Sequence, residues 1–397
     1  MRAKPLSGIR VLDLTRLLPG PMATLHLADM GADVIKIEDT EAGDYARGMG
    51  PMSEAARGRD SADPPMSDFF RLVNRNKRAM RLDLKRTQGC EVFLNLAKSA
   101  DVVVEGFRPG VMAKLGIGYD AVVAANPRLV YCSITGYGQD GPYAQRAGHD
   151  INYIGYAGVG DQIGTAETPV VPNFQIADLL GGTLAPVMGI LAALIDAKSS
   201  GRGRHVDVSM TDAVLAHAIF PLLGFLEHGK TPGRGSGMLD GGLPCYNVYR
   251  TRDDRWMAVG ALERKFWETL CDILGCPELK GKHMVYGEEA RPVKERLDAV
   301  FVLRTQREWS EIFVRVDCCV SPILTMDETM ENEQLRARAM FVAEGGLTQF
   351  ALPLRFSEFE FAIKRPAPGP GEHTEDILRE AGYRDAQIAA LRESGVI

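Results

Sequence analysis

The 397-residue sequence lacks the motifs that define several large classes of enzyme. It has no GxGxxG segment after its first strand-like run, where the chain reads Leu18-Pro19-Gly20-Pro21, and this disfavours a nicotinamide or flavin enzyme. It also has no GxSxG, HExxH or P-loop motif. The longest charge-free run, 179–195, is shorter than the roughly 20 residues of a membrane-spanning helix and contains Pro186. We therefore predict a buried core helix in this run.

Paired cysteines, a targeting segment and a strong net charge are also missing. The seven cysteines show no CxxC pairing, which favours reduced thiols and disfavours a structural zinc. The start, 1–5, has no signal-peptide apolar segment, and the end, 394–397, is not a peroxisomal tripeptide. A net charge of −6 gives no whole-chain attraction to nucleic acid or to an anionic membrane. We expect a cytoplasmic protein with neither of these partners.

The first part of the chain alternates short apolar runs with helical patterns. The strand-like runs are 9–14, 34–37, 101–104 and 129–134, and the helical patterns between them lie near 21–30, 89–99 and 119–125. A helix from Asp178 to about Lys198, a strand at 205–209 and a helix at 211–227 follow. Repeated β-α units predict an α/β fold with a parallel sheet that binds ligands at the carboxyl ends of its strands.

The pattern changes near residue 230. A hairpin is predicted from 246–251 and 256–260, followed by a helix from about Arg264, which indicates a smaller α+β domain over 230–335. The large domain would then comprise 1–229 and a return segment, 336–397. The stretch 49–67 is rich in Gly, Pro and charge without periodicity, which is typical of a surface loop.

Three ionisable residues occupy positions suited to proton transfer. His149 follows the loop 135–146 and opens a helical pattern, where an imidazole can exchange protons at neutral pH and the amides near Asp150 can stabilise an oxyanion. The alternative is a helix-capping Asp150 beside a structural histidine. Asp178 directly precedes the apolar helical run. At this position it could be a base, a nucleophile or a simple N-cap. Glu263 ends a strand-like run, where it is either functional or a surface cap.

Basic residues lie near the predicted carboxyl edge of the sheet. A cluster there could hold phosphate groups, although solvated surface charge is the alternative. The candidates are Lys36, Arg75, Lys77, Arg108 and Lys114.

Taken together, these segments resemble the class III CoA-transferase (CaiB/BaiF-type) superfamily, and within it the α-methylacyl-CoA racemases. The racemase branch is indicated by Gly-His-Asp-Ile-Asn-Tyr at 148–153 and by Val-Gly-Ala-Leu-Glu at 259–263, whereas transferases usually carry Tyr or Phe in place of His149. Phe174 stands where racemases have Asn, which points to a different acyl pocket. The superfamily segments span nearly the whole chain: 5–8, 31–36, 74–85, 105–118, 135–142, 201–210, 238–242 and 371–378.

The resemblance implies an interlocked homodimer that needs no metal or redox cofactor. His149 and Asp178 would lie on opposite faces of the α-carbon of an acyl-CoA, one removing the proton and the other returning it. Glu263 would orient or protonate His149 from the other subunit. Tyr153 and the five basic candidates would contact CoA, and the loop 49–67 could cover its entrance.

Three hypotheses stay open from the sequence. The first is racemisation of 2-methylacyl-CoA. The second is CoA transfer between carboxylic acids with Asp178 as covalent nucleophile. The third is a CoA-binding protein without catalysis.

Overall fold

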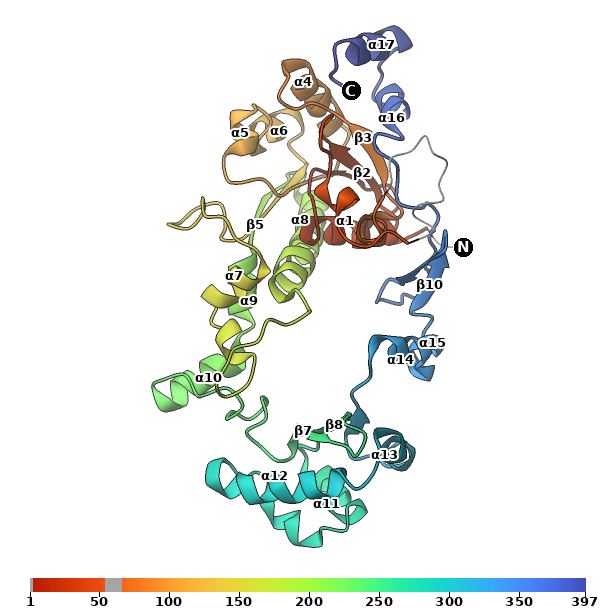
Figure 1. Cartoon of the computed structure of the whole chain (residues 1–397). Coiled ribbons are helices and arrows are strands. Elements are labelled where there is room, and N and C mark those ends of the chain that lie inside the picture. Colours follow the sequence, from red (N-terminus) through yellow and green to blue (C-terminus); the bar gives the residue numbers. More distant parts are fainter. Residues whose placement is uncertain (1–2, 54–65) are drawn as a thin grey trace. The chain divides into compact units, whose positions relative to one another are not determined.

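The computed structural model describes residues 3–53 and 66–397, so most of the predicted loop 49–67 lies outside the described residues (Figure 1). The chain divides into two compact units. Unit 1 comprises the described parts of Met1–Ile154, Phe174–Ala216 and Gln334–Ile397, and unit 2 comprises Gly155–Asn173 and His217–Glu333. Unit 2 therefore begins before the predicted boundary at 230 and also takes up 155–173, which the sequence assigned to the large domain.

A parallel sheet forms the centre of unit 1, as the sequence predicted, and it contains six strands. The strand order is β3-β2-β1-β4-β5-β6, and Leu12 of the central strand pairs with Ile35 on one side and Val103 on the other. The order reverses between β1 and β4, where a doubly wound sheet forms its ligand crevice. The strands are β1 (Arg10–Asp13), β2 (Asp33–Glu38), β3 (Arg78–Arg81), β4 (Val102–Glu105), β5 (Val130–Thr135) and β6 (His205–Ser209).

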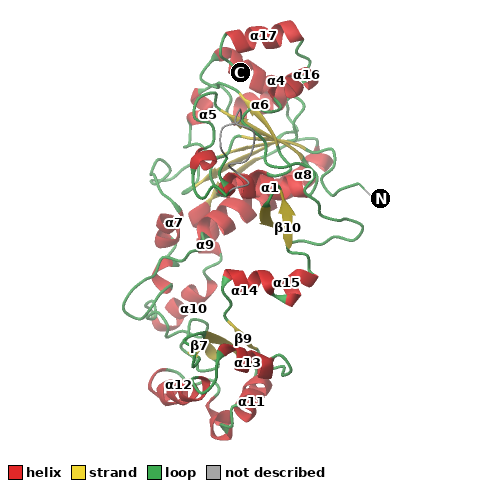
Figure 2. Cartoon of the chain, turned by 45° about the vertical axis from the view of Figure 1, so that its right-hand side comes forward, coloured by secondary structure: helices red, strands yellow, loops and turns green. Residues whose placement is uncertain are grey.

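Helices cover both faces of this sheet (Figures 1 and 2). On one face, Leu12, Ile35 and Val103 pack with Phe93 and Leu378 in a continuous apolar core. The helices on this face are α4 (Thr87–Ala97), α5 (Val111–Lys114), α6 (Tyr119–Ala125), α16 (Thr374–Glu380) and α17 (Asp385–Glu393). The opposite face carries α1 (Pro19–Asp29) and α8 (Ala185–Ser200), and α3 (Asp68–Asn74) contacts α1. A hairpin of β10 (Phe341–Glu344) and β11 (Leu347–Phe350) precedes the C-terminal helices.

The helix predicted from Asp178 begins one residue earlier. A π-helical segment, η3 (Ala177–Leu184), continues directly into α8, and the combined helix contacts α1, β6 and α9 (Met210–Ala216). By length and composition alone it could cross a membrane, but it packs on the sheet. The prediction of a buried core helix is correct for one side only, because Leu184, Met188 and Ile195 are exposed.

The predicted helix 211–227 is two helices, α9 in unit 1 and α10 (Ile219–His228) in unit 2. Pro221 explains the break, because in a continuous helix its ring would clash with the carbonyl of His217. No side chain of α10 is buried.

Unit 2 contains the predicted hairpin, extended by a third antiparallel strand. The sheet comprises β7 (Tyr246–Arg250), β8 (Trp256–Gly260) and β9 (Val320–Pro322). Its core contains Trp267, Phe301 and Trp309. The helices of this part are α11 (Arg264–Ile273), α12 (Gly287–Phe301), α13 (Gln306–Phe313) and α14 (Met326–Glu331), with α15 (Glu333–Ala337) at the return to unit 1.

Candidate active site

A cavity of about 640 Å³ lies in unit 1 at the carboxyl ends of β1, β4 and β5. This is the reversal point of the strand order, where an open α/β sheet binds its ligand. Its lining includes Arg16, Phe107, Arg108, Tyr137, Arg146, His149, Tyr153, Asp178 and Met210.

The structure brings His149 and Asp178 together in the wall of this cavity, although they belong to different elements. His149 directly precedes α7 (Asp150–Tyr156) and is exposed. Its amide donates to Asn152 Oδ1 at 3.0 Å, which fixes the backbone that carries the imidazole. Asp178 lies in the first turn of η3 and is partly buried.

Asp150 provides the helix cap that the sequence suggested as one alternative role of Asp178. Asp150 Oδ1 accepts the amides of Ala177 at 2.6 Å and Asp178 at 3.0 Å, so it caps η3 from α7. The carboxylate of Asp178 is thereby released from capping and faces the cavity. The sequence placed Asp150 among the catalytic residues. In the structure its side chain has a structural role, because it holds the start of η3. Since the His149 amide is engaged, the amide of Asp150 is the better oxyanion donor.

The environment of Asp178 raises its pKa toward neutral pH. Burial raises the pKa of Asp178 to about 6, the nearby charge of Asp150 adds to the increase, and His149 opposes it. Such a carboxyl group exchanges a proton more readily at physiological pH than an ordinary aspartate does.

Tyr153 lines the cavity and supports the His149 segment. Its hydroxyl donates to the carbonyl of Gly148, and its ring makes an edge contact with Tyr137 at 5.3 Å. Burial raises the pKa of Tyr153 to about 12, so it stays protonated. A Cβ atom at Gly136 would lie 2.2 Å from this ring, and glycine is therefore needed for the close approach.

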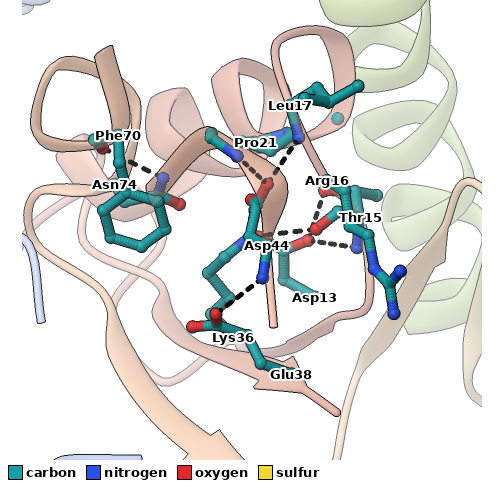
Figure 3. A network of polar contacts seen from close by, with 12 residues as sticks. Asp13, Thr15, Arg16, Leu17, Pro21, Lys36, Glu38, Asp44, Phe70 and Asn74 are labelled. Carbon is teal, nitrogen blue, oxygen red and sulfur yellow. Dashed lines mark hydrogen bonds and ion pairs between the residues drawn. The ribbon is translucent and has the colours of Figure 1, made fainter. Parts of the chain in front are cut away.

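Three of the predicted phosphate-binding residues do not reach the cavity. Lys36 is fully buried, donates to the Thr15 carbonyl at 2.9 Å and pairs with Asp44 at 2.8 Å (Figure 3). Lys77 is buried beside Asp13 at 3.1 Å. Arg75 binds Asp29 at 2.7 Å and also Gln349. All three side chains are buried and none lines the cavity, so none of them is a direct phosphate ligand.

The remaining basic candidates are exposed, but only Arg108 lines the cavity. Lys114 lies in the last turn of α5 outside it. The sequence interpretation missed Arg16 and Arg146, which both line the cavity. Arg16 could have been found, because it lies in the loop that follows β1 at the carboxyl edge of the sheet.

Glu263 lies in unit 2 and does not line this cavity. It occupies the N-cap position of α11, but its exposed side chain makes no capping bond. Unit 2 has a cavity of its own, about 430 Å³, lined by Asp240, Gly260 and Cys319 among others. Phe174, at the variant racemase position, is exposed.

Among residues 3–53 and 66–397, no group of three or more His, Cys, Asp or Glu side chains could hold a metal ion.

The fold and the cavity define a Rossmann-type α/β protein with a histidine and an aspartate at its ligand crevice. The chain belongs to CoA-transferase family III, whose profile matches residues 6–374. It is 35% identical over 399 residues to the alpha-methylacyl-CoA racemase of Homo sapiens, covering 99% of this chain and 97% of the relative. It is 34% identical to the succinate–glutarate CoA-transferase of Agrobacterium fabrum (strain C58 / ATCC 33970), covering 96% of each.

A solved structure agrees with this assignment. A CAIB/BAIF family protein from Brucella suis superimposes with a TM-score of 0.82 at 29% identity, covering 96% of this chain and 100% of that one. The chain is thus an enzyme of this family, with racemases and transferases at similar identity.

Proposed function

We propose that this enzyme racemises the α-carbon of 2-methyl-branched acyl-CoA thioesters. The observation that carries the proposal is that His149 and Asp178 line one cavity. The raised pKa of Asp178, about 6, suits a group that gives and takes a proton near neutrality. The 34–35% identity to two mammalian alpha-methylacyl-CoA racemases supports the same reaction.

The proposed reaction uses two acid–base groups, one on each face of the α-carbon. One group removes the α-proton, and the electron pair moves onto the thioester oxygen to give an enolate. The other group then delivers a proton to the opposite face, and the carbonyl re-forms with inverted configuration. The thioester acidifies the α-hydrogen more than an oxygen ester would, so the proposal requires no metal or redox cofactor. The Asp150 amide would stabilise the enolate oxygen.

We further propose that the working enzyme is a homodimer. Every side chain of α10 is partly or fully exposed, and this includes Ile219, Phe220, Leu222 and Phe225. Exposed apolar patches of this kind mark protein–protein contacts. Glu263 of one subunit would then assist His149 of the other.

Exchange in heavy water tests the racemisation. Each epimer of a 2-methylacyl-CoA should incorporate α-deuterium without any acid co-substrate. Asp178→Asn and His149→Ala should each lower the rate of racemisation by about 100-fold or more. Asp196→Asn is a matched control, because Asp196 lies on the same continuous helix outside the cavity. Absence of exchange across a panel of branched acyl-CoAs would refute the proposal.

CoA transfer between carboxylic acids is the second candidate, favoured by CoA-transferase relatives at 31–34% identity. The same Asp178 would form a covalent acyl or CoA adduct. Trapping with hydroxylamine or borohydride should then change the mass of the peptide that carries Asp178. An unmodified peptide during turnover would exclude this candidate.

A further inference from the structure

The loop that follows β1 is held at three points of its backbone. The amide and hydroxyl of Thr15 donate to Asp13 Oδ1 at 2.9 and 2.5 Å, and the Thr15 carbonyl accepts from Lys36 Nζ. The amide of Leu17 donates to Asp44 Oδ1 at 3.0 Å. Leu17 has a φ of 64°, a left-handed conformation that leucine rarely adopts. Arg16 therefore stands between two residues that leave its backbone little freedom.

Buried charges impose this geometry (Figure 3). Asp13, Lys36, Asp44 and Lys77 form a network of two carboxylates and two ammonium groups, and all four side chains are fully buried. Lys77 also donates to the carbonyl of Pro21 at 2.8 Å, which ties the network to the first turn of α1. Backbone strain that persists beside a cavity, held by the surrounding structure, is a mark of functional sites.

The side chain of Arg16 is fixed as well. Its Nη2 atom binds Asp39 Oδ2 at 2.7 Å, and the guanidinium carbon lies 5.4 Å from the ring of Tyr45 and 5.6 Å from that of Phe107. Asp39 is itself held by three backbone amides, of residues 41–43. A guanidinium has five N–H donors, so several remain for a ligand in the cavity that Arg16 lines.

The polarity of the cavity favours an anion. Its lining includes three arginines, Arg16, Arg108 and Arg146, but a single carboxylate, Asp178. Arg108 is exposed and makes no side-chain hydrogen bond or ion pair within the described part of the chain. Arg16 is thus a pre-positioned cation of this wall.

We infer that Arg16 binds a phosphate group of the CoA moiety, and that buried Lys36 and Lys77 act on the ligand only by positioning the Arg16 loop. The inference rests on the proposed function and adds to it a residue that makes the enzyme specific for CoA over pantetheine thioesters. A planar guanidinium held in one orientation suits phosphate recognition. Its ordering cost on binding is small, because the ordering has already taken place in the free enzyme.

A series of thioesters tests this role. The same 2-methylacyl group is presented on pantetheine, 4′-phosphopantetheine, 3′-dephospho-CoA and CoA, and KM and kcat are measured for the wild type, Arg16→Ala and Arg16→Lys. Arg16→Ala should raise KM for the CoA thioester about tenfold or more while kcat changes little. For the pantetheine thioester it should change neither constant. Arg16→Lys should restore part of the affinity. The smallest thioester of the series whose KM is raised by Arg16→Ala identifies the phosphate that Arg16 binds.

Arg204→Ala is the matched control, because it breaks another arginine–aspartate pair, with Asp196, outside the cavity. Lys36→Met should reproduce the KM effect of Arg16→Ala. An equal effect of Arg16→Ala on the CoA and pantetheine thioesters would overturn the inference. Calorimetric binding of free CoA separates the two proposals: CoA binding without racemisation defeats only the proposed reaction, whereas wild-type affinity in Arg16→Ala defeats only the phosphate contact.

Discussion

Asp150 and Asp178 show how neighbouring carboxylates of one site acquire different tasks. Asp150 uses one oxygen to hold the amides of Ala177 and Asp178, and its charge therefore stays beside the second carboxylate. Burial and this charge raise the pKa of Asp178 to about 6. The same contact thus fixes the position of Asp178 and adjusts its acidity.

Replacing Asp150 by Asn should move the pH profile of the reaction. Asn keeps an oxygen that accepts the two amides but removes the negative charge, so the pKa of Asp178 should fall while burial keeps it above its ordinary value. A base works only when ionised, so the acid limb of kcat/KM should shift to lower pH by about one unit or less. The profile is measured from pH 4.5 to 8 with the epimer that Asp178 deprotonates. An unmoved acid limb would contradict this account of Asp178.

At the scale of elements, the ends of the strands carry buried ionisable groups beneath the cavity. Glu105 ends β4, is 4% exposed and accepts the amide of Phe107 at 2.8 Å, which anchors the loop that carries Arg108. Burial raises its pKa to about 7, and a hydrogen bond from Ser133 only partly offsets this. The folded state therefore holds the Glu105 proton more tightly than the unfolded state does.

Glu105→Gln should remove a pH dependence of stability. The stabilising contribution of a carboxyl group with a raised pKa is full below its ordinary value of 4.5 and is lost as pH rises through about 7. The variant should therefore gain thermal stability relative to the wild type at pH 8 but not at pH 4. Melting temperatures at the two pH values test this, with exposed Glu91→Gln as control. The same difference at both pH values would argue against it.

Lys77→Met should destabilise unit 1. It removes a buried ammonium group that binds Asp13, Asn74 and the Pro21 carbonyl, and breaking one partner of a buried ion pair typically costs about 3–5 kcal/mol. Burial and the nearby Lys36 lower the pKa of Lys77 to about 8, although Asp13 opposes the shift. Urea unfolding should be followed by circular dichroism, because all three tryptophans, at 256, 267 and 309, lie in unit 2. Exposed Arg204→Met should leave the midpoint unchanged, and a similarly small effect of Lys77→Met would contradict the prediction.

At the scale of the whole molecule, the exposed apolar side chains of α10 provide a test of the proposed dimer. Leu222→Glu combined with Phe225→Glu should convert a dimer into monomers, because two charges would be buried unpaired at the contact. Light scattering after size-exclusion chromatography measures the mass. Glu227→Gln on the same helix should remain dimeric, and a wild-type monomer at micromolar concentration would refute the dimer proposal.

A site shared between subunits also predicts complementation. Asp178→Asn and Glu263→Ala should each be strongly impaired alone. In each mixed dimer, both substitutions fall in one of the two sites, and the other site is intact. Since about half of the dimers formed by random co-assembly are mixed, about a quarter of wild-type activity should return. No recovery in a verified mixed dimer would place Glu263 in the same chain's site or outside the reaction.

The α/β class and five of the six strands followed from sequence patterns that depend on local chemistry, and the acid–base candidates followed from those patterns together with the family resemblance. Apolar alternation identifies strands wherever one face is buried, and β6 was predicted with its observed limits. The helix break that Pro221 causes could also have been predicted from the sequence. The apolar residues on both sides of Pro221 instead suggested one continuous helix.

The partners of the basic residues were decided by the tertiary structure alone. From the sequence, Lys36 and Lys77 have the position of cations at the edge of a sheet. The fold instead pairs Lys36 with Asp44 and brings Lys77 to Asp13, 64 residues away, because burial forces each charge to take a partner. The fold also decided which carboxylate caps η3. Asp150, 28 positions before Asp178, accepts the amide of Asp178 and so provides the cap. Sequence fixes which residues can carry charge, whereas only the folded chain decides which charges remain available to a ligand, since electrostatic pairing depends on distance in space.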